Sequence, residues 1–398
     1  MKINPLAAFL WVIASGTPLA AANGVAAEVI PPNFSLPFKL IDNRVFVQIR
    51  LNRRGPFYFI LDTGADADLS ERAARRLGLS VEDAGVGQGV GATLQHFARA
   101  HIARVQLGKL QLNDVEFAVT SFADAPQVFG VQPLDGFIGR KIFEHMVVKH
   151  DYSHRLLTFV RPDRFAYSGA GTVLHFERPR QIPVIEAKLD GVAGKFGVDT
   201  GARSALLLYG PFCEQNKLAE KYGAKLEGVT GWGIGGPVRS LLARAHELSL
   251  GTTSVHDPVI RLATQKGGLS ASSVIAGLIG PDVLSQFDVT FDYARQCIIL
   301  EKSRDYDRRD SYDRAGLWMG QQGKRFVAVD VIAGGPADEA DVRTGDTILA
   351  IDGRNTANLV LPEIRETMRR WPNGRRVTLL LESRGVKRTA IITLRDLV

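Results

Sequence analysis

Cysteine is scarce in this sequence, since only Cys213 and Cys297 occur among its 398 residues. Two cysteines form one disulfide at most, so a disulfide-rich scaffold is excluded, while a single disulfide and two buried thiols both remain open. Neither cysteine lies in a segment typical of a catalytic thiol, and the sequence has no Gly-x-Ser-x-Gly segment. A cysteine or serine hydrolase is therefore not expected.

Long hydrophobic runs are also lacking. Beyond the first residues, no run approaches the roughly 20 apolar residues that a membrane span needs. At the start, Met1-Lys2 precedes an apolar stretch from Leu6 to Ala14, and small residues follow at 20–22 and 25–27. This pattern predicts a signal peptide over residues 1–27 and a periplasmic or secreted protein. The alternative is an uncleaved anchor, which would be the only membrane contact.

Neither sign of charge is concentrated in one half of the chain. The net charge is +7 at pH 7, but Lys and Arg are mixed with Asp and Glu, and no basic helix or aromatic stacking platform appears. Nucleic acid is therefore not an expected partner. Hydrophobic residues make up 45% of the chain, which allows more than one domain with its own core.

A small histidine cluster invites a metal-site interpretation. It consists of His145, His150 and His154, with Asp151 among them. Alternation along a strand would point His150 and Asp151 to opposite faces, so these side chains would not converge on one ion. We expect no metal and no other cofactor.

The chain contains the triplet Asp-Thr-Gly twice, at 62–64 and 199–201, and a hydrophobic run precedes each copy. Further pairs recur at nearly the same spacing. Gly136-Phe137-Ile138-Gly139 corresponds to Gly277-Leu278-Ile279-Gly280, and Asp151-Tyr152 corresponds to Asp292-Tyr293. These correspondences indicate a duplicated unit of roughly 130 residues.

Two such triplets can bring the carboxylates of Asp62 and Asp199 face to face. At roughly 3 Å and an effective dielectric constant near 20, two ionised carboxylates repel by about 5 kcal/mol, so the pair would hold one proton. One carboxylate can then accept a proton from water while the other donates one to a carbonyl, which is the chemistry of amide hydrolysis. The alternative is that the aspartates only cap turns.

Glycine-rich segments follow each triplet. The first contains Gly87 and Gly89, and the second contains Gly233 and Gly235. Glycine at this density suits mobile hairpin tips. A phosphate-binding loop would need a helix directly after it, which the sequence does not indicate. Two interpretations of these segments remain: they are flaps that close over a substrate, or they are hairpins that only connect strands.

Residues 35–302 resemble the aspartic proteases of the retropepsin and pepsin type. The resemblance implies a mostly β, two-lobed β-barrel fold in which one chain supplies both halves of the site, so a monomer is sufficient. It assigns general acid and base roles to Asp62 and Asp199. It assigns support of the catalytic turns to Thr63, Gly64, Thr200 and Gly201. It assigns contact with a peptide substrate to Asp66, Gly87, Gly89, Gly233 and Gly235.

Local patterns agree with this fold. Residues 45–51 and 57–61 form a predicted strand hairpin, as do residues 182–189 and 195–198 in the second copy, and a short helix is predicted over 70–77. Ala65 and Ala202 stand where many pepsin-like enzymes carry Ser or Thr after the Gly. Without a hydroxyl donor to the carboxylate, protonation is favoured, so we expect cleavage to extend closer to neutral pH.

The C-terminal part resembles a PDZ domain, on the segments Gly334-Gly335-Pro336-Ala337 and 345–353 and a helical stretch over 362–370. PDZ domains add a peptide as an extra strand at an exposed sheet edge and often bind its terminal carboxylate. Trp318 stands where the familiar motif usually has glycine, and a purely structural role is the alternative. Asp396-Leu397-Val398 could itself dock in such a groove. The resemblance assigns the peptide groove to Leu317, Trp318, Met319 and Gly320.

Together these features predict an exported aspartic endopeptidase whose PDZ domain binds a substrate or partner peptide. The alternative is a non-catalytic peptide-binding protein that uses the same cleft and groove. The charged run that begins at Lys302 is expected to be a solvated linker. The predicted organisation is a signal peptide over residues 1–27, protease lobe 1 over 28–165 and protease lobe 2 over 166–302. The linker follows over 303–314, and the PDZ domain over 315–398.

Overall fold

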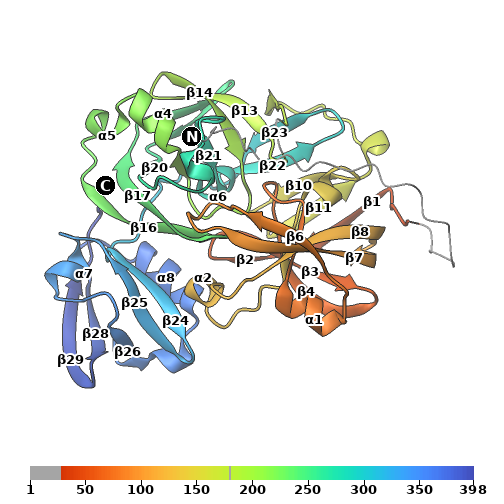
Figure 1. Cartoon of the computed structure of the whole chain (residues 1–398). Helices are drawn as coiled ribbons and strands as arrows, with labels where there is room; N and C mark the ends of the chain where they lie inside the picture. The colour runs from red at the N-terminus through yellow and green to blue at the C-terminus, as the bar shows by residue number, and fades with distance from the viewer. Residues whose placement is uncertain (1–27, 179–180) are drawn as a thin grey trace, which may run out of the picture.

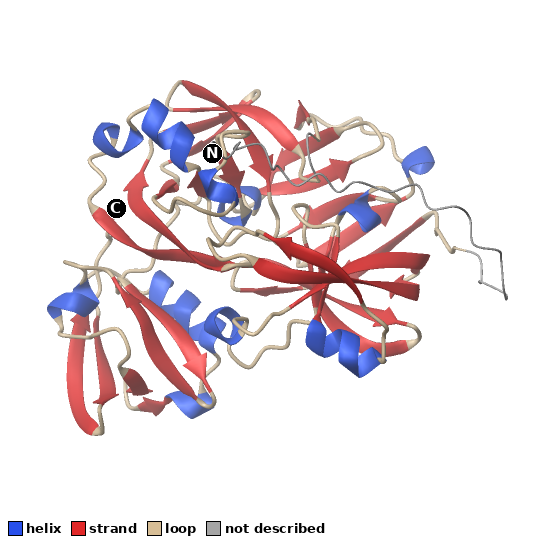
Figure 2. Ribbon diagram, viewed as in Figure 1, coloured by secondary structure: helices blue, strands red, loops and turns tan. Residues whose placement is uncertain are grey.

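The computed structural model describes residues 28–178 and 181–398, which form four β-sheets with short helices at their edges (Figures 1 and 2). The predicted fold class, mostly β with an α+β domain at the C-terminal end, is confirmed. The predicted signal peptide lies outside the described residues. No helix within the described residues has the length and apolar character needed to cross a bilayer.

The first sheet contains the first Asp-Thr-Gly corner and forms lobe 1. An additional pairing between β3 and β7 closes the sheet on itself, as in a barrel. The predicted hairpin is confirmed as β3 and β4, with β4 starting three residues earlier than predicted. In order across the sheet, the strands are β2 (Lys39–Ile41), β3 (Arg44–Leu51), β4 (Arg54–Leu61), β9 (Gly136–Ile138), β5 (Ala67–Ser70), β8 (Leu110–Thr120), β7 (Gln95–Leu107) and β6 (Glu82–Gly87).

The second sheet contains the second corner and forms lobe 2. Its hairpin β13–β14 corresponds to β3–β4 and confirms the prediction for the second copy, with shifts of two and three residues at the strand starts. In order, the strands are β16 (Leu226–Gly233), β17 (Gly236–Arg244), β20 (Val259–Ala263), β15 (Leu206–Leu208), β21 (Gly277–Ile279), β14 (Val192–Val198), β13 (Val184–Leu189), β18 (Glu247–Leu250) and β19 (Thr253–His256).

A third sheet joins the two lobes. Strands from the ends of the two duplicated units pair antiparallel at its centre, with His150 opposite Val289. His150 is fully buried against the rings of Phe143 and Phe291, and burial lowers its pKa to about 3. One continuous hydrophobic core therefore runs through both lobes. In order, the strands are β1 (Asn33–Pro37), β11 (Leu156–Val160), β10 (Val147–Asp151), β22 (Phe287–Asp292), β23 (Cys297–Lys302) and β12 (Thr172–His175).

The fourth sheet belongs to the PDZ domain, which has its own core and lies against both lobes (Figure 1). Strand β24 is at one edge of this sheet and helix α8 (Leu361–Arg370) runs beside it. In order, the strands are β24 (Leu317–Gln322), β25 (Arg325–Val331), β26 (Thr347–Ile351), β28 (Arg376–Ser383) and β29 (Val386–Thr393), and β27 (Arg354–Asn355) pairs with β26.

The remaining helices are short. The predicted helix after the first corner is confirmed as α1, where the Ser70 hydroxyl accepts a hydrogen bond from the N–H of Ala73 at 3.1 Å and caps the first turn. Gly78 ends this helix with a φ of 70°. The other helices are α2 (Pro126–Phe129), α3 (Arg140–Phe143), α4 (Gly210–Gln215), α5 (Leu218–Lys221), α6 (Pro281–Leu284) and α7 (Pro336–Glu339), and α1 spans Glu71–Leu77.

The charged run between lobe 2 and the PDZ domain is not simply solvated, contrary to the prediction. Asp310 is 7% exposed, and its carboxylate accepts a hydrogen bond from the N–H of Val259 at 3.0 Å. The Tyr306 hydroxyl donates to the carbonyl of Ser254 at 2.8 Å. These residues supply hydrogen-bond partners for backbone groups of β19 and β20 in lobe 2. Part of the run is therefore packed against lobe 2, while its arginines remain exposed.

Candidate active site

The two Asp-Thr-Gly corners have the same backbone support. The N–H of Asp62 donates to the carbonyl of Ile138 at 3.0 Å, and the N–H of Asp199 donates to the carbonyl of Ile279 at 2.9 Å. Both acceptors belong to the hydrophobic-hydrophobic-Gly segments that the sequence comparison paired. The duplication therefore builds two equivalent corners at the ends of β4 and β14.

Thr63 and Thr200 join the corners across the interface between the lobes. Each hydroxyl oxygen accepts a hydrogen bond from the N–H of the other threonine at 3.0 Å. Each hydroxyl also donates to a carbonyl of the opposite lobe, Thr63 to Val198 at 2.6 Å and Thr200 to Leu61 at 2.9 Å. Both threonines are fully buried, so these four bonds fix the distance between the two corners.

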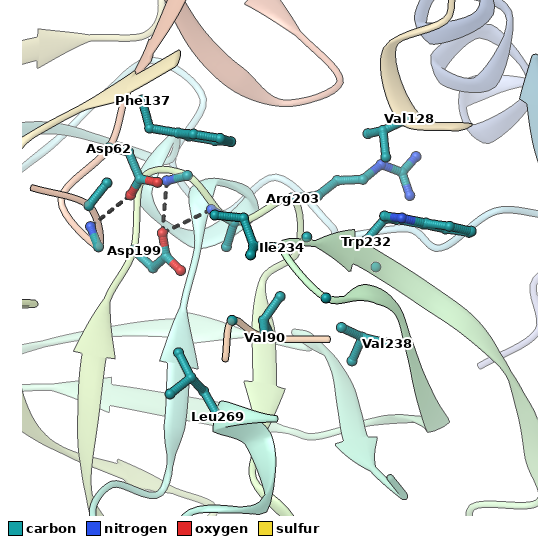
Figure 3. A pocket seen from close by; sticks show the side chains of 18 of the residues that line it. Asp62, Val90, Val128, Phe137, Asp199, Arg203, Trp232, Ile234, Val238 and Leu269 are labelled. Atoms are coloured by element: carbon teal, nitrogen blue, oxygen red, sulfur yellow. Dashed lines mark hydrogen bonds between the residues drawn. The ribbon is translucent and has the colours of Figure 1, made fainter. Parts of the chain in front are cut away.

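This interface brings the carboxyl groups of Asp62 and Asp199 side by side (Figure 3), close enough for each to shift the pKa of the other. Asp62 accepts one backbone hydrogen bond, from Gly64 at 2.7 Å. Asp199 accepts two, from Gly201 at 2.8 Å and from Ala202 at 3.0 Å. A Cβ atom on Gly201 would lie 2.2 Å from a carboxyl oxygen of Asp62, so this close approach requires glycine.

The two carboxyl groups differ in their tendency to ionise. Burial, followed by the charge of Asp199, raises the pKa of Asp62 well above its usual range. Burial also raises the pKa of Asp199, but the hydrogen bonds from Gly201 and Ala202 oppose this effect. Since Asp199 has the larger number of donors, its ionised form is favoured over that of Asp62.

A cavity of about 570 Å³ lies over this pair of carboxyl groups. Apolar side chains from both lobes line it, including Phe137 from lobe 1 and Val238 and Leu269 from lobe 2 (Figure 3). Its size is in the range of sites that bind small molecules or short peptide segments. The geometry therefore offers an apolar site with two carboxyl groups at its base.

The two glycine-rich hairpins, β6–β7 in lobe 1 and β16–β17 in lobe 2, meet above the cavity. The N–H of Gly91 donates to the carbonyl of Ile234 at 3.0 Å, and the N–H of Thr93 donates to the carbonyl of Gly235 at 3.0 Å. The first hairpin also contacts lobe 2, where Gln265 Nε2 donates to the carbonyl of Val90 at 2.7 Å. Both hairpins are therefore in a closed position, and an extended chain needs them to separate before it can enter.

Arginines form one wall of the cavity. Arg44 Nε donates to the carbonyl of Gly201 at 2.7 Å, next to the second corner. Arg44 and Arg203 both pair with the buried carboxylate of Asp42, at 2.6 and 2.8 Å. Arg261, 6% exposed, also lines the cavity, and its Nε has no hydrogen-bond partner among the described residues. This wall therefore combines Arg44 from lobe 1 with Arg203 and Arg261 from lobe 2, and Asp42 is the shared partner of the first two.

The structure separates the predicted substrate-binding residues into two groups. Gly89, Gly233 and Gly235 line the cavity, whereas Asp66 and Gly87 are not part of its lining. Asp66 instead forms an ion pair with Arg140 at 2.5 Å. Substrate contact by all five residues stays a prediction.

The predicted PDZ groove residues all lie on or next to the edge strand β24, and all four are buried. Trp318 is 7% exposed and lies near Trp232 of the second glycine-rich hairpin, with ring centroids 6.4 Å apart and ring planes tilted by 31°. The C-terminal residues Leu397 and Val398 pack between lobe 2 and the PDZ domain, where Arg244 donates to the Val398 carbonyl.

Several residues near the site were not found from the sequence. Asp68 lines the cavity, and burial together with the charge of Asp66 raises its pKa to about 7. Arg44 lies on β3, the strand before the one that leads into the first triplet, whereas Arg261 lies on β20, far from the second triplet in the sequence. The one available signal was the contrast between Asp66 in the first copy and Arg203 in the second.

The described residues include no group of three or more His, Cys, Asp or Glu side chains arranged to hold a metal ion. Cys213 and Cys297 are both buried and unpaired, which decides between the two alternatives for the cysteines.

Comparison with known families gives two matches. Residues 47–135 match the family described as "gag-polyprotein putative aspartyl protease", and residues 327–383 match the PDZ domain family. No curated protein matches the chain. The first match covers the corner with Asp62 and the first hairpin, and the second covers most of the C-terminal sheet. Residues 47–135 are therefore similar to an aspartyl protease domain and residues 327–383 are similar to a PDZ domain, which agrees with the fusion suspected from the sequence.

Proposed function

We propose that the chain is an exported aspartic endopeptidase that hydrolyses peptide bonds at the pair formed by Asp62 and Asp199. The observation that carries this proposal is the contact between the two carboxyl groups, one from each lobe, at the base of an apolar cavity. The threonine bonds between the lobes support it, because they hold the corners in one fixed relation. Export rests on the apolar N-terminal stretch in the sequence alone.

In this mechanism a water molecule binds between the carboxyl groups. Ionised Asp199 takes a proton from the water, whose oxygen attacks the peptide carbonyl carbon, while Asp62 donates its proton to the carbonyl oxygen. The resulting diol collapses when Asp199 gives its proton to the leaving nitrogen and Asp62 recovers a proton from a hydroxyl. Every proton is returned, so no cofactor is consumed.

The experiment is cleavage of an unstructured protein by the wild type, Asp62→Asn and Asp199→Asn, with and without a statine-type transition-state analogue. We expect the wild type alone to cleave, with inhibition by the analogue, since each variant lacks one of the two proton carriers. Loss of either carboxyl group should reduce turnover by about 10³-fold or more, because proton transfer contributes 10²–10⁴-fold at each step.

Turnover that survives either substitution would contradict the shared mechanism. Equal, slow cleavage by all three proteins would instead favour a non-catalytic peptide-binding protein that uses the same cleft.

A further inference from the structure

The edge of the PDZ sheet that would bind a peptide is occupied by lobe 1. Helix α2 contacts both the edge strand β24 and helix α8, and it lies beside them in Figure 1. Its residues form no ladder with β24, which is the terminal strand of its sheet. The occupant is therefore a helical turn from the protease unit rather than an added strand.

Arg365 on α8 supplies the polar contacts of this arrangement. Its guanidinium donates to the carbonyls of Gln127 at 2.7 Å and Val128 at 2.8 Å, and also to the carbonyl of Met319 on β24. Trp318 Nε1 donates to the same Gln127 carbonyl at 3.3 Å. Arg365 is 7% exposed, so a buried cation satisfies the last carbonyls of α2.

The packing of α2 against β24 and α8 leaves no space for a peptide between them. A Cβ atom on Gly320 would lie 2.0 Å from Gln127 Oε1, and one on Gly130 would lie 2.3 Å from Gln321 Oε1 and 3.1 Å from the Cβ of Leu361. A peptide could add to β24 only after α2 had left.

The loop that would bind a terminal carboxylate is also occupied. The carboxylate of Asp313 accepts hydrogen bonds from the N–H groups of Leu317 at 2.8 Å and Ala315 at 3.2 Å. An incoming carboxylate would therefore meet donors that are already paired and a like charge beside them.

The opposite face of α2 belongs to the protease cavity. Val128 and Phe129 line the cavity, and the Arg44 guanidinium lies 5.2 Å from the centroid of the Phe129 ring. Arg44 in turn donates to the carbonyl of Gly201 in the second catalytic corner. The same short segment thus has the PDZ domain on one side and the active-site cavity on the other.

One buried carboxylate connects the two sides. Asp42 pairs with Arg44 at 2.6 Å and Arg203 at 2.8 Å, and lies 3.6 Å from Arg365 of the PDZ domain. The Trp318 ring links the same arginines a second time. The guanidinium of Arg365 lies 4.6 Å from the ring centroid, and that of Arg203 lies 5.5 Å from it.

We propose that the PDZ groove takes the α2 segment of the same chain as its ligand, and that Arg365 is the positioning residue through which the PDZ domain fixes this wall of the substrate cavity. This arrangement is independent of whether the carboxyl pair turns over substrate. Free peptides compete poorly with it, because a tethered segment acts at a high effective concentration.

The first test is amide hydrogen exchange of the full chain with Arg365→Met, and with Arg370→Met as the matched control. Arg370 is on the same helix, but its side chain is 65% exposed and pairs with Glu366. We expect Arg365→Met to raise exchange in 122–131 and 317–322 together by about tenfold or more, while β28 and β29 keep their protection. Arg370→Met should match the wild type.

A second variant leaves the PDZ domain unchanged. Gly130→Val places side-chain atoms against Gln321 at a backbone φ of 60°, and should release α2 from the groove. A labelled synthetic peptide of residues 121–131 should then bind to Gly130→Val with 1:1 stoichiometry and not to the wild type, as measured by fluorescence anisotropy.

Three outcomes would overturn the proposal. They are unchanged exchange of 122–131 in Arg365→Met, equal binding of the peptide to wild type and Gly130→Val, and no binding of the peptide to Gly130→Val. If the wild type cleaves peptides, Arg365→Met should raise KM with little change in kcat, because it loosens a wall and leaves the carboxyl pair in place.

Discussion

The hydroxyl oxygen of Thr63 accepts a hydrogen bond from the N–H of Thr200, and the hydroxyl oxygen of Thr200 accepts one from the N–H of Thr63, both at 3.0 Å. Neither residue has any exposed surface. Because the two threonines come from different lobes and adjoin the two aspartates, this exchange sets the separation of the carboxyl groups.

Replacing Thr63 by valine keeps the shape of the side chain and removes its hydroxyl. The N–H of Thr200 and the carbonyl of Val198 then lose a partner inside the protein, and unpaired buried groups cost about 1–3 kcal/mol each. We expect the free energy of unfolding to fall by about 2–4 kcal/mol in urea titrations.

Thr200→Val should have a similar effect, and the double variant should lose less than the sum, since both changes disrupt one network. The control is Thr158→Val, whose hydroxyl pairs with Ser35 at the surface, and which should stay within about 0.5 kcal/mol of the wild type. An unfolding free energy of Thr63→Val equal to that of the wild type would show that the threonine bonds do not hold the lobes.

The raised pKa of Asp62 makes stability depend on pH with a definite sign. Below about pH 4 both the folded and the unfolded states hold this proton. At higher pH the unfolded state releases it first, so the free energy of unfolding falls until the pH passes the raised pKa of the folded state. Asparagine cannot ionise, so Asp62→Asn should gain stability relative to the wild type between pH 4 and pH 7.

Urea unfolding of both proteins at about pH 4 and about pH 7 measures this difference. Asp257→Asn changes an exposed aspartate and should show the same pH dependence as the wild type. A stability difference between wild type and Asp62→Asn that is identical at both pH values would contradict the pKa shift.

The alanines after the two glycines should extend activity toward neutral pH. Ala65 and Ala202 offer no hydroxyl to the carboxylates, and burial already raises the pKa of both aspartates. The pair therefore keeps its proton to higher pH, and the double variant Ala65→Ser with Ala202→Ser should move the upper limb of the rate profile to lower pH. A wild-type profile that peaks below about pH 3 and is lost by about pH 5 would contradict this expectation.

A larger side chain where the tips of the two glycine-rich hairpins touch should reduce activity. A Cβ atom on Gly91 would lie 2.1 Å from the carbonyl carbon of Gly235, so Gly91→Val should force the tips apart. We expect kcat/KM to fall by roughly tenfold to a hundredfold, because substrate positioning is lost. Gly231→Ala is the control in the second hairpin, where the new Cβ would meet Val238 at an ordinary 3.8 Å. Equal kcat/KM for Gly91→Val and wild type would exclude a role of the closed tips.

Features encoded by local patterns could be predicted from the sequence. The Asp-Thr-Gly corners, the hairpin of β3 and β4, and the helix capped by Ser70 each depend on residues within about 20 positions of one another. The duplication added the equivalence of the corners, because two copies of one pattern fold alike.

Features built from distant segments could not be predicted in the same way. Arg44 and Arg261 lie on strands separated by most of the protease unit, and only the folded sheets bring both to the cavity. Asp310 stands in a charged run typical of solvent, yet it pairs with a backbone N–H of lobe 2. The docking of α2 on the PDZ domain likewise depends on steric fit and on one buried arginine, for which the sequence has no periodic signal.

The shared proton is the central claim, and the infrared spectrum of the carboxyl groups tests it most directly. The difference between wild type and the double variant Asp62→Asn with Asp199→Asn is recorded at about pH 6, two units above the ordinary aspartate pKa of about 3.9. We predict one protonated carboxyl band and one carboxylate band in this difference. Two carboxylate bands, with no protonated carboxyl group lost in the variant, would contradict the claim.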